Sequence, residues 1–111
     1  SEVVYAGGGG GSGYSDHETA GGGVGGTIVG GRGGGYVGGT PTSPVVNTGS
    51  GGGANSNGMG TAGASGIVIV RYPTTLTIVN ADDLTFTTTT VSGNKVSSFT
   101  AGTGSIMFDI I

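Results

Sequence analysis

The residues best suited to metal or acid–base chemistry lie together at Asp16-His17-Glu18. This tripeptide holds the only histidine of the chain between two carboxylates. Adjacent side chains share a metal ion only if a turn folds them toward one another, and structural metal sites draw ligands from several positions. No second ligand cluster is evident, so a polar turn is the alternative that we favour, and we expect no metal.

A second acidic group, formed by Asn80, Asp82 and Asp83, offers oxygen atoms of the kind that calcium binds. The ligand spacing of an EF-hand loop is absent. Asn and Asp side chains also hydrogen-bond to their own backbone in turns. We therefore expect a turn at Asn80–Asp83.

The glycine-rich sequence Gly21–Gly26 (GGGVGG) matches the dinucleotide-binding pattern G-x-G-x-x-G. That pattern requires a following helix whose N-terminus holds a pyrophosphate. Thr27-Ile28-Val29-Gly30 follows instead, so we expect no cofactor. Ser12 and Ser15 lie near His17, but no third group is evident that would orient a base. We expect no catalytic residues and no enzyme.

Composition excludes several partners. Only 8% of the residues are charged, the net charge is −3, and the cations are Arg32, Arg71 and Lys95. A chain with so few cations offers no surface for a phosphate backbone, so nucleic acid is not an expected partner. No segment approaches the roughly 18 apolar residues of a membrane span. The absence of cysteine excludes disulfides and thiolate metal sites.

Glycine divides the chain into two parts. The stretch from Gly7 to Gly66 holds 26 of the 29 glycines, whereas the remainder is rich in Val, Ile, Thr and Phe. We predict a glycine-rich module at 1–72, with bounding strands, and a β-strand assembly segment at 73–111. The chain begins at Ser1 without a methionine, which we interpret as a processed product, a fragment or a repeat of a longer protein.

The glycine runs cannot form an ordinary hydrophobic core or credible α-helices. They can form polyproline II-type helices, which have three residues per turn and leave their backbone groups free to bond to neighbouring helices. The segments between the runs, Tyr14–Ala20, Thr27–Val29, Thr40–Thr48 and Ala54–Asn57, are the expected turns. A flexible linker is the alternative. Apolar interruptions such as Val24, Val29 and Val37 favour the ordered structure.

The apolar and β-branched runs of the chain predict short strands. One strand is expected at Glu2–Ala6, before the glycine runs. Further strands are expected after them at 67–72, 76–80, 84–91, 95–100 and 105–111. Ser92-Gly93-Asn94 is a hairpin turn. The fold class is therefore all-β and irregular, with packed polyglycine II-type helices and a small antiparallel sheet or sandwich. The Thr87–Thr90 run suits the ordering of water, as on ice-binding surfaces, or the attachment of sugars, and ordinary β-propensity of a solvent-facing strand is the alternative that we favour.

Two stretches carry a resemblance to a known family. Val3–Gly11 (VVYAGGGGG) resembles the opening of a glycine-rich domain of bacteriophage tail and fibre proteins, and Ala64–Tyr72 (ASGIVIVRY) resembles its close. The match covers about two thirds of the chain. The resemblance implies packed polyglycine helices, as in the related adhesins at phage fibre tips and in some antifreeze proteins.

One departure from that family concerns the order of its parts. The stretch Lys95–Phe108 is similar to strands that usually precede the glycine tract in that family. Placing Ile111 before Ser1 restores the family order. We therefore expect the C-terminal strands to complete the module of the next copy, with local packing of these strands as the alternative. The expected assembly residues are Val3, Val4, Tyr5, Ile106, Phe108 and Ile110.

These observations predict a structural building block of a virion tail fibre or related extracellular filament, assembling head-to-tail by β-strand addition. The first alternative is a receptor-binding adhesin that displays turn loops to a cell-surface receptor or glycan. The second is an ice-binding protein that uses the Thr-rich face. We expect a virion-surface or extracellular location, self-association and no membrane insertion. The candidate ligand-contact residues are Tyr14, His17, Tyr36, Asn55, Asn57 and Met59.

Overall fold

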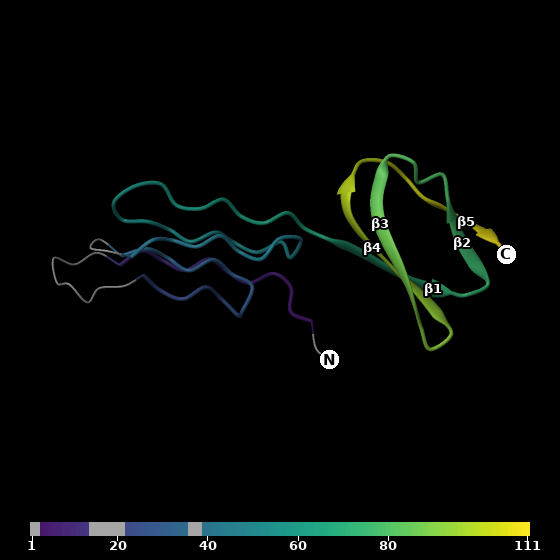
Figure 1. Ribbon diagram of the computed structural model, residues 1–111, viewed down its shortest axis with the longest axis horizontal. Coiled ribbons are helices and arrows are strands. Elements are labelled where there is room, and N and C mark those ends of the chain that lie inside the picture. Colours follow the sequence, from purple (N-terminus) through teal and green to yellow (C-terminus); the bar gives the residue numbers. More distant parts are fainter. Residues whose placement is uncertain (1–2, 14–21, 36–38) are drawn as a thin grey trace. The chain divides into compact units, whose positions relative to one another are not determined.

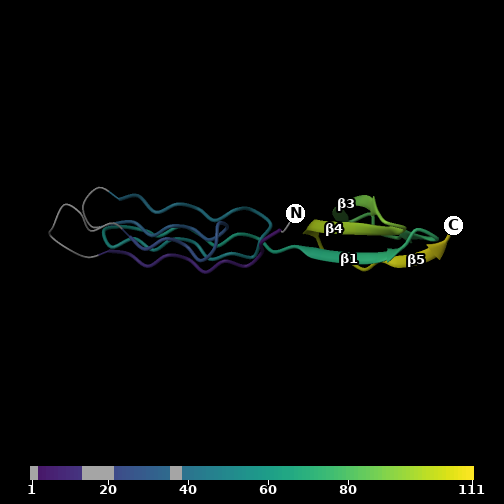
Figure 2. The same cartoon turned by 90° about the horizontal axis from the view of Figure 1, so that it is seen from below.

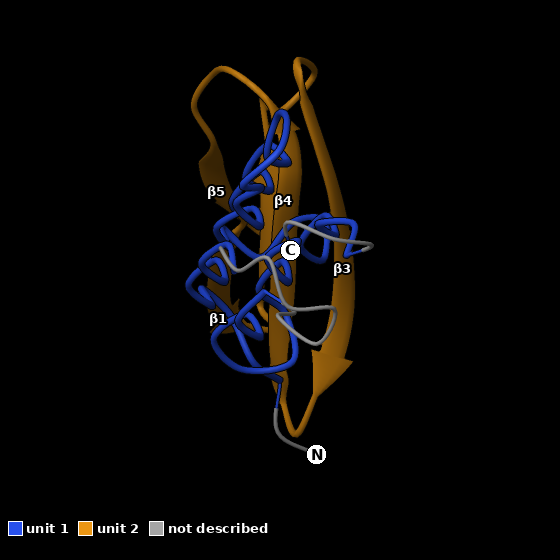
Figure 3. Ribbon diagram, turned by 90° about the vertical axis from the view of Figure 1, so that its left-hand side faces the viewer, with its two compact units in different colours: residues 1–66 blue, residues 67–111 orange. Residues whose placement is uncertain are grey.

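The computed structural model describes residues 3–13, 22–35 and 39–111. It divides into two compact units, Ser1–Gly66 and Ile67–Ile111, which we name the glycine unit and the β unit and describe separately (Figure 3). We expected the boundary after Tyr72. It lies after Gly66 because the strand that follows, β1 (Val68–Pro73), pairs within the β unit.

The described part of the glycine unit runs in six extended segments (Figure 1). No helix or strand occurs in these ranges, apart from an isolated parallel bridge between Gly13 and Gly35. The segments are I (residues 6–13), II (22–26), III (29–35), IV (39–45), V (48–54) and VI (60–66).

Backbone hydrogen bonds join the segments and recur at every third residue. The amides of Gly10 and Gly13 in segment I donate to the carbonyls of Gly31 and Gly34 in segment III, at 2.8 and 3.1 Å. Both residue numbers rise together, so the two segments run parallel. Burial has the same period, because Gly7 and Gly10 are buried while the two residues between them are exposed.

Segments I, III and V form a closed triangle of donors and acceptors. Segment III donates to segment V, from Gly31 to Gly51 at 2.9 Å, and segment V donates back to segment I, from Ala54 to Gly10 at 3.0 Å. Segments II, IV and VI run antiparallel to the members of this triangle. In segment II, the amides of Gly23 and Gly26 donate to the carbonyls of Gly11 and Gly8 in segment I. In segment IV, Thr42 and Val45 donate in the same way to Arg32 and Val29 of segment III. In segment VI, Thr61 and Ala64 donate to Gly53 and Ser50 of segment V.

The close approach of these backbones requires that no Cβ stands between them. A Cβ on Gly9 would clash with the carbonyl of Gly52, and one on Gly53 would clash with the carbonyl of Arg32. A Cβ on Gly8 would meet nothing within 4 Å. Glycine is therefore required by packing at some positions of a segment and not at others.

A few side chains are buried among the segments. Ser50 is 2% exposed, and its hydroxyl accepts the Gly7 amide at 2.9 Å. Thr48 lies 2.7 Å from Ser50, hydroxyl to hydroxyl, and donates to the Val45 carbonyl at 2.7 Å. Val29, 6% exposed, is the one buried large apolar side chain in the described part of this unit.

Two sequence-based expectations about this unit are wrong. Residues 3–6 of the predicted strand Glu2–Ala6 form no strand, and Ala6 has a φ of 59° with its amide donating to Thr48. The predicted turn Thr40–Thr48 is confined to residues 46–48, where Asn47 has a φ of 56°.

Prolines explain why the stretch before that turn is a bonded segment. Thr42 and Val45 are the donors of segment IV, and Pro41 and Pro44 each stand at the position just before a donor. Proline has no amide hydrogen and a φ near −65°, so it fits the non-donating positions of an extended segment.

The β unit contains five strands in two antiparallel sheets (Figures 1 and 2). One sheet has the order β1-β4-β3 and the other pairs β2 with β5. The strands predicted at 67–72, 76–80, 84–91, 95–100 and 105–111 are confirmed to within a few residues at their ends. The observed bounds are β1 (Val68–Pro73), β2 (Leu76–Val79), β3 (Leu84–Val91), β4 (Asn94–Gly102) and β5 (Met107–Ile110).

A two-residue turn sets the register of β3 on β4. Val91 lies opposite Asn94, and Ser92 and Gly93 between them have φ values of 48° and 77°. Two consecutive positive φ angles define a type I′ turn, whose twist matches that of the strands. A bulge interrupts the pairing between Thr85 and Phe86.

The two sheets are joined by a small contact around Tyr72. Its ring lies 5.0 Å from that of Phe108 on β5, centroid to centroid. Lys95 of β4 donates to the Leu76 carbonyl of β2 at 2.8 Å. Tyr72 is the only large apolar side chain of this unit that is buried, and Met107, Ile110 and other apolar residues remain exposed.

Candidate assembly and binding surfaces

A row of hydroxyl groups crosses the three-stranded sheet beside Tyr72. Ser97 on β4 is fully buried, and its Oγ lies 2.8 Å from the Tyr72 hydroxyl on β1 and 2.6 Å from Thr88 Oγ1 on β3. This row is not predicted from the sequence. The row exists because Ser97 lies opposite Val70 on β1 and opposite Thr88 on β3. This register is set by pairing between strands that are distant in the sequence, so the local spacing of residues does not predict it.

The Thr87–Thr90 run is divided between the two faces of the sheet. Side chains alternate along a strand, and Thr88 contacts Ser97 on the face that carries Tyr72. Thr87 and Thr89 consequently point to the opposite face. Each face of the sheet therefore carries two of the four threonines, so the run does not form a four-residue threonine array on one face.

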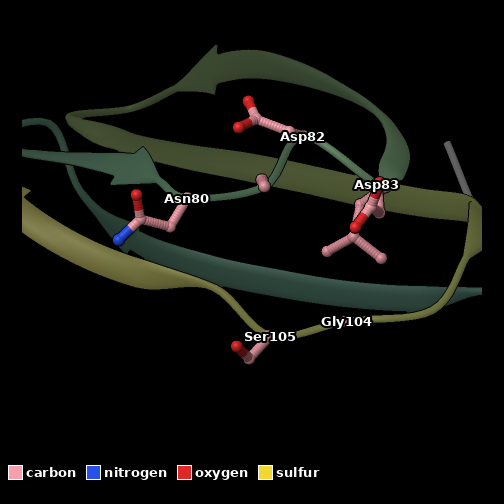
Figure 4. Close-up of a pocket in the computed structure, with 7 residues that line it drawn as sticks. Asn80, Asp82, Asp83, Gly104 and Ser105 are labelled. Atoms are coloured by element: carbon pink, nitrogen blue, oxygen red, sulfur yellow. The ribbon is translucent and has the colours of Figure 1, made fainter.

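The predicted turn at Asn80–Asp83 lines a hollow of about 240 Å³ (Figure 4). Asn80 has a φ of 56°, and the Leu84 amide donates to the Ala81 carbonyl at 3.0 Å, as in a β-turn. Figure 4 shows the carboxylates of Asp82 and Asp83 pointing in different directions. Over the described residues, no three His, Cys, Asp or Glu side chains gather as metal ligands.

The predicted assembly residues fall into two environments. Val3 and Tyr5 are 65% and 41% exposed, Val4 is half-buried, and none of the three belongs to a strand. Phe108 and Ile110 lie on β5, which pairs with β2 of the same chain.

The structure therefore shows the alternative, in which the terminal strand β5 packs within its own chain. The Ile111 amide holds the end of the chain by donating to the Thr75 carbonyl at 2.9 Å. Two apolar side chains of β5 nevertheless remain exposed, Phe108 at 41% and Ile110 at 78%, whereas Ile106 before the strand is half-buried.

The candidate ligand-contact residues are described only in part. Tyr14, His17 and Tyr36 lie outside the described residues. Asn55 and Asn57 form a turn in which the Asn57 amide donates to Asn55 Oδ1 at 3.3 Å, and Met59 is 90% exposed.

The ends of segments I, III and V meet beside this turn. Gly13 bridges to Gly35, and the Ser56 hydroxyl donates to the Gly13 carbonyl at 2.9 Å. The turn that carries Met59 is thus fixed to the end of the parallel triangle, which places it on an ordered support.

No helix in the described residues has the length and apolar character needed to cross a membrane. No family model matches the chain, and neither a curated protein nor a solved structure matches it.

Proposed function

We propose that this chain is a non-enzymatic structural building block of a virion tail fibre or a related extracellular filament. In this proposal the glycine unit is a scaffold of packed polyglycine II-type helices, and the β unit joins copies of the chain. The single observation that carries the proposal is the three-residue recurrence of hydrogen bonds between the segments.

A three-residue period distinguishes this packing from the two common alternatives. Bonds of an α-helix lie within one segment, and side chains of a β-strand alternate with a period of two. A polyproline II helix has three residues per turn, so successive residues point in three directions about 120° apart. Gly10 donates to segment III and Gly11 accepts from segment II, as such a helix requires.

Backbone angles support the same helix. In the described part of the unit, positive φ values occur at Ala6, Thr27, Asn47, Gly49 and Gly58, which lie in turns or near the start of a segment. The glycines between them have negative φ, although glycine adopts either sign readily. Negative φ is compatible with the left-handed polyproline II helix, which the three-residue period of the hydrogen bonds separates from a β-strand.

Such a bundle suits a load-bearing or display scaffold. Its interior consists of backbone amides that bond to neighbouring segments, so few side chains are needed to hold it together. The resemblance of Val3–Gly11 and Ala64–Tyr72 to a phage tail and fibre domain supports a role on a virion surface.

Amide hydrogen exchange tests the helix assignment. Bonded amides exchange slowly because they must open first. We expect protection at Thr61 and Ala64 and fast exchange at Ala62 and Gly63, which lie between them on the same segment. Protection at alternate residues would indicate a β-strand instead, and uniform fast exchange would indicate a flexible linker.

Self-assembly by strand addition is supported by the exposed apolar residues at both ends of the chain. Val3 and Tyr5 are exposed outside any strand, and Ile110 on β5 is 78% exposed. An extended segment can add to an open strand edge through its backbone, with apolar side chains setting the register. Because a head-to-tail contact that does not close repeats indefinitely, it produces a filament.

Electron microscopy of the purified chain over a range of concentrations tests assembly. We expect filaments for the native chain and their loss in Ile110→Asp, which places a charge in the proposed contact. Val24→Asp is the matched control, because Val24 is 80% exposed and lies in the glycine unit. Discrete particles at every concentration would reject the filament.

A receptor-binding adhesin is the second candidate, and the turn at 55–59 favours it. This turn is fixed to the ends of the parallel segments and carries a Met59 side chain that is 90% exposed. Loops on a rigid support are frequent recognition sites. Binding of the chain to a cell-surface receptor or glycan should then fall in Met59→Ser and remain in Thr103→Ser, an exposed threonine of the β unit.

A further inference from the structure

Four of the five strands of the β unit have an edge without a partner among the described residues. The four edges differ in the features that prevent pairing with another chain. β1 carries Arg71 and ends at Pro73, and β2 and β5 have four residues each. β3 has eight residues from Leu84 to Val91, and none of them is charged or proline. Charge, proline and short length are the usual means by which sheet edges resist pairing, and β3 lacks all three.

The type I′ turn determines which backbone groups β3 presents at its open edge. Val91 and Asn94 flank the two turn residues, so they form a hydrogen-bonded pair. Such pairs alternate with non-bonded pairs along antiparallel strands. Thr89 and Thr87 therefore bond to β4, whereas the amides and carbonyls of Thr90 and Thr88, and of Phe86 beyond them, point outward.

We propose that the open edge of β3 pairs antiparallel with β3 of a second copy of this chain, across a two-fold axis at Thr88. The two sheets then join into one with the order β1-β4-β3-β3-β4-β1. A two-fold contact uses the same surface on both copies, so one chain supplies both halves of the interface.

Three features place the axis at Thr88. The bulge between Thr85 and Phe86 limits regular pairing to the stretch from Phe86 onward. A centre at Thr88 makes each outward-pointing residue face another outward-pointing residue, with Phe86 opposite Thr90. It also sets threonine opposite threonine near the axis, and such cross-strand pairs are favourable.

Charge does not oppose this contact. The chain has a net charge of −3, but β3 contributes none of it. Like charges directly opposite on paired strands are destabilising, and this edge brings none together. The inference does not depend on the proposed filament, which uses β5 and the N-terminal residues.

A pair of single-cysteine variants tests both the contact and its register, because the native chain has no cysteine. In Thr88→Cys the two thiols lie in a directly opposed pair, with Cα atoms about 5.5 Å apart, inside the range that a disulfide spans. In Thr90→Cys the two thiols are four residues apart along the strands, about 13 Å, which no disulfide spans.

We expect mild oxidation to give a covalent dimer of Thr88→Cys and to leave Thr90→Cys monomeric on denaturing gels. Both variants are on the same strand and the same face, and they differ in that Thr88→Cys also removes the hydroxyl that contacts Ser97. Equal cross-linking of the two variants, or none in either, would overturn the proposal.

Sedimentation velocity of the native chain gives an independent test. We expect a dimer at high concentration, with a dissociation constant raised at least about tenfold by Thr89→Lys, since each copy then places a charge near the axis. Thr103→Lys introduces the same charge on an exposed residue outside β3 and should leave the constant unchanged. A native chain that stays monomeric, or equal effects of the two lysine variants, would contradict the contact.

Discussion

The two units of this chain satisfy their backbone amides and carbonyls in different ways. In the glycine unit the backbones are themselves the interior, and amides such as that of Gly31 bond to a neighbouring segment at 2.9 Å. In the β unit the backbones lie within sheets, and side chains such as Tyr72 and Phe108 fill the space between the sheets.

The comparison shows that each unit depends on a different kind of residue. The glycine unit requires the absence of side chains at positions such as Gly9 and Gly53, where a Cβ would meet a carbonyl. The β unit requires particular side chains, since Tyr72 is its one buried large apolar residue and Ser97 bonds to both neighbouring strands. Adding a side chain at such glycines should therefore destabilise the glycine unit, and removing one at such positions should destabilise the β unit.

The largest expected effect separates two adjacent glycines. Gly9→Ala should destabilise the glycine unit by about 3 kcal/mol, because its methyl group meets the Gly52 carbonyl and overpacking costs 1–3 kcal/mol or more. Gly8→Ala should be neutral or more stable by up to about 0.5 kcal/mol, since space is open there and alanine restricts the unfolded chain. Calorimetry measures both. Equal destabilisation would show that close packing of the segments is not what requires glycine.

The next largest effect concerns the hydroxyl row of the β unit. Ser97→Ala removes the partner of the Tyr72 hydroxyl, and an unsatisfied buried polar group costs about 1–3 kcal/mol. Ser98→Ala, the next residue on the opposite face, should change stability by less than about 0.5 kcal/mol. Thermal unfolding followed by tyrosine fluorescence compares them, and similar values for both would exclude a special role for the hydroxyl row.

The smallest effect of the three tests whether side chains matter in the glycine unit. Ser50→Ala removes the acceptor of the Gly7 amide and should destabilise that unit by about 1 kcal/mol. Ser65→Ala removes an exposed bond to Asn47 and should have almost no effect. Hydrogen exchange of Thr61 reports the local free energy of opening. If both serine variants behave alike, the unit is held by its backbone alone.

Local sequence was sufficient for most strands of the β unit. Ile67–Tyr72 and Leu84–Val91 combine β-branched residues with clear ends, and Ser92-Gly93 supplies the positive φ values that a tight hairpin needs. The same reasoning failed at Val3–Ala6, where an apolar run is not paired as a strand. A strand needs a partner as well as propensity, and propensity alone does not indicate whether a partner is present.

The candidate surfaces were less predictable than the strands. The exposed Met59 turn follows from its position between glycine runs, whereas the hydroxyl row and the open edge of β3 depend on which strand pairs with which. Pro41 and Pro44 indicated a turn by composition, yet they lie in segment IV because only Thr42 and Val45 need to donate there. Proline restricts the chain locally, and the neighbouring segment determines whether that restriction produces a turn.

The sequence by itself determined that the chain has two parts of different composition. It also determined that glycine excludes an ordinary hydrophobic core in the first part and that the second part forms short antiparallel strands. Only the tertiary structure decided that segments I, III and V close into a parallel triangle, that β5 pairs with β2, and that β3 lies at an edge. The physical reason is that composition and period act over a few residues. Partner choice depends on backbone groups that lie tens of residues apart and meet only when the chain folds.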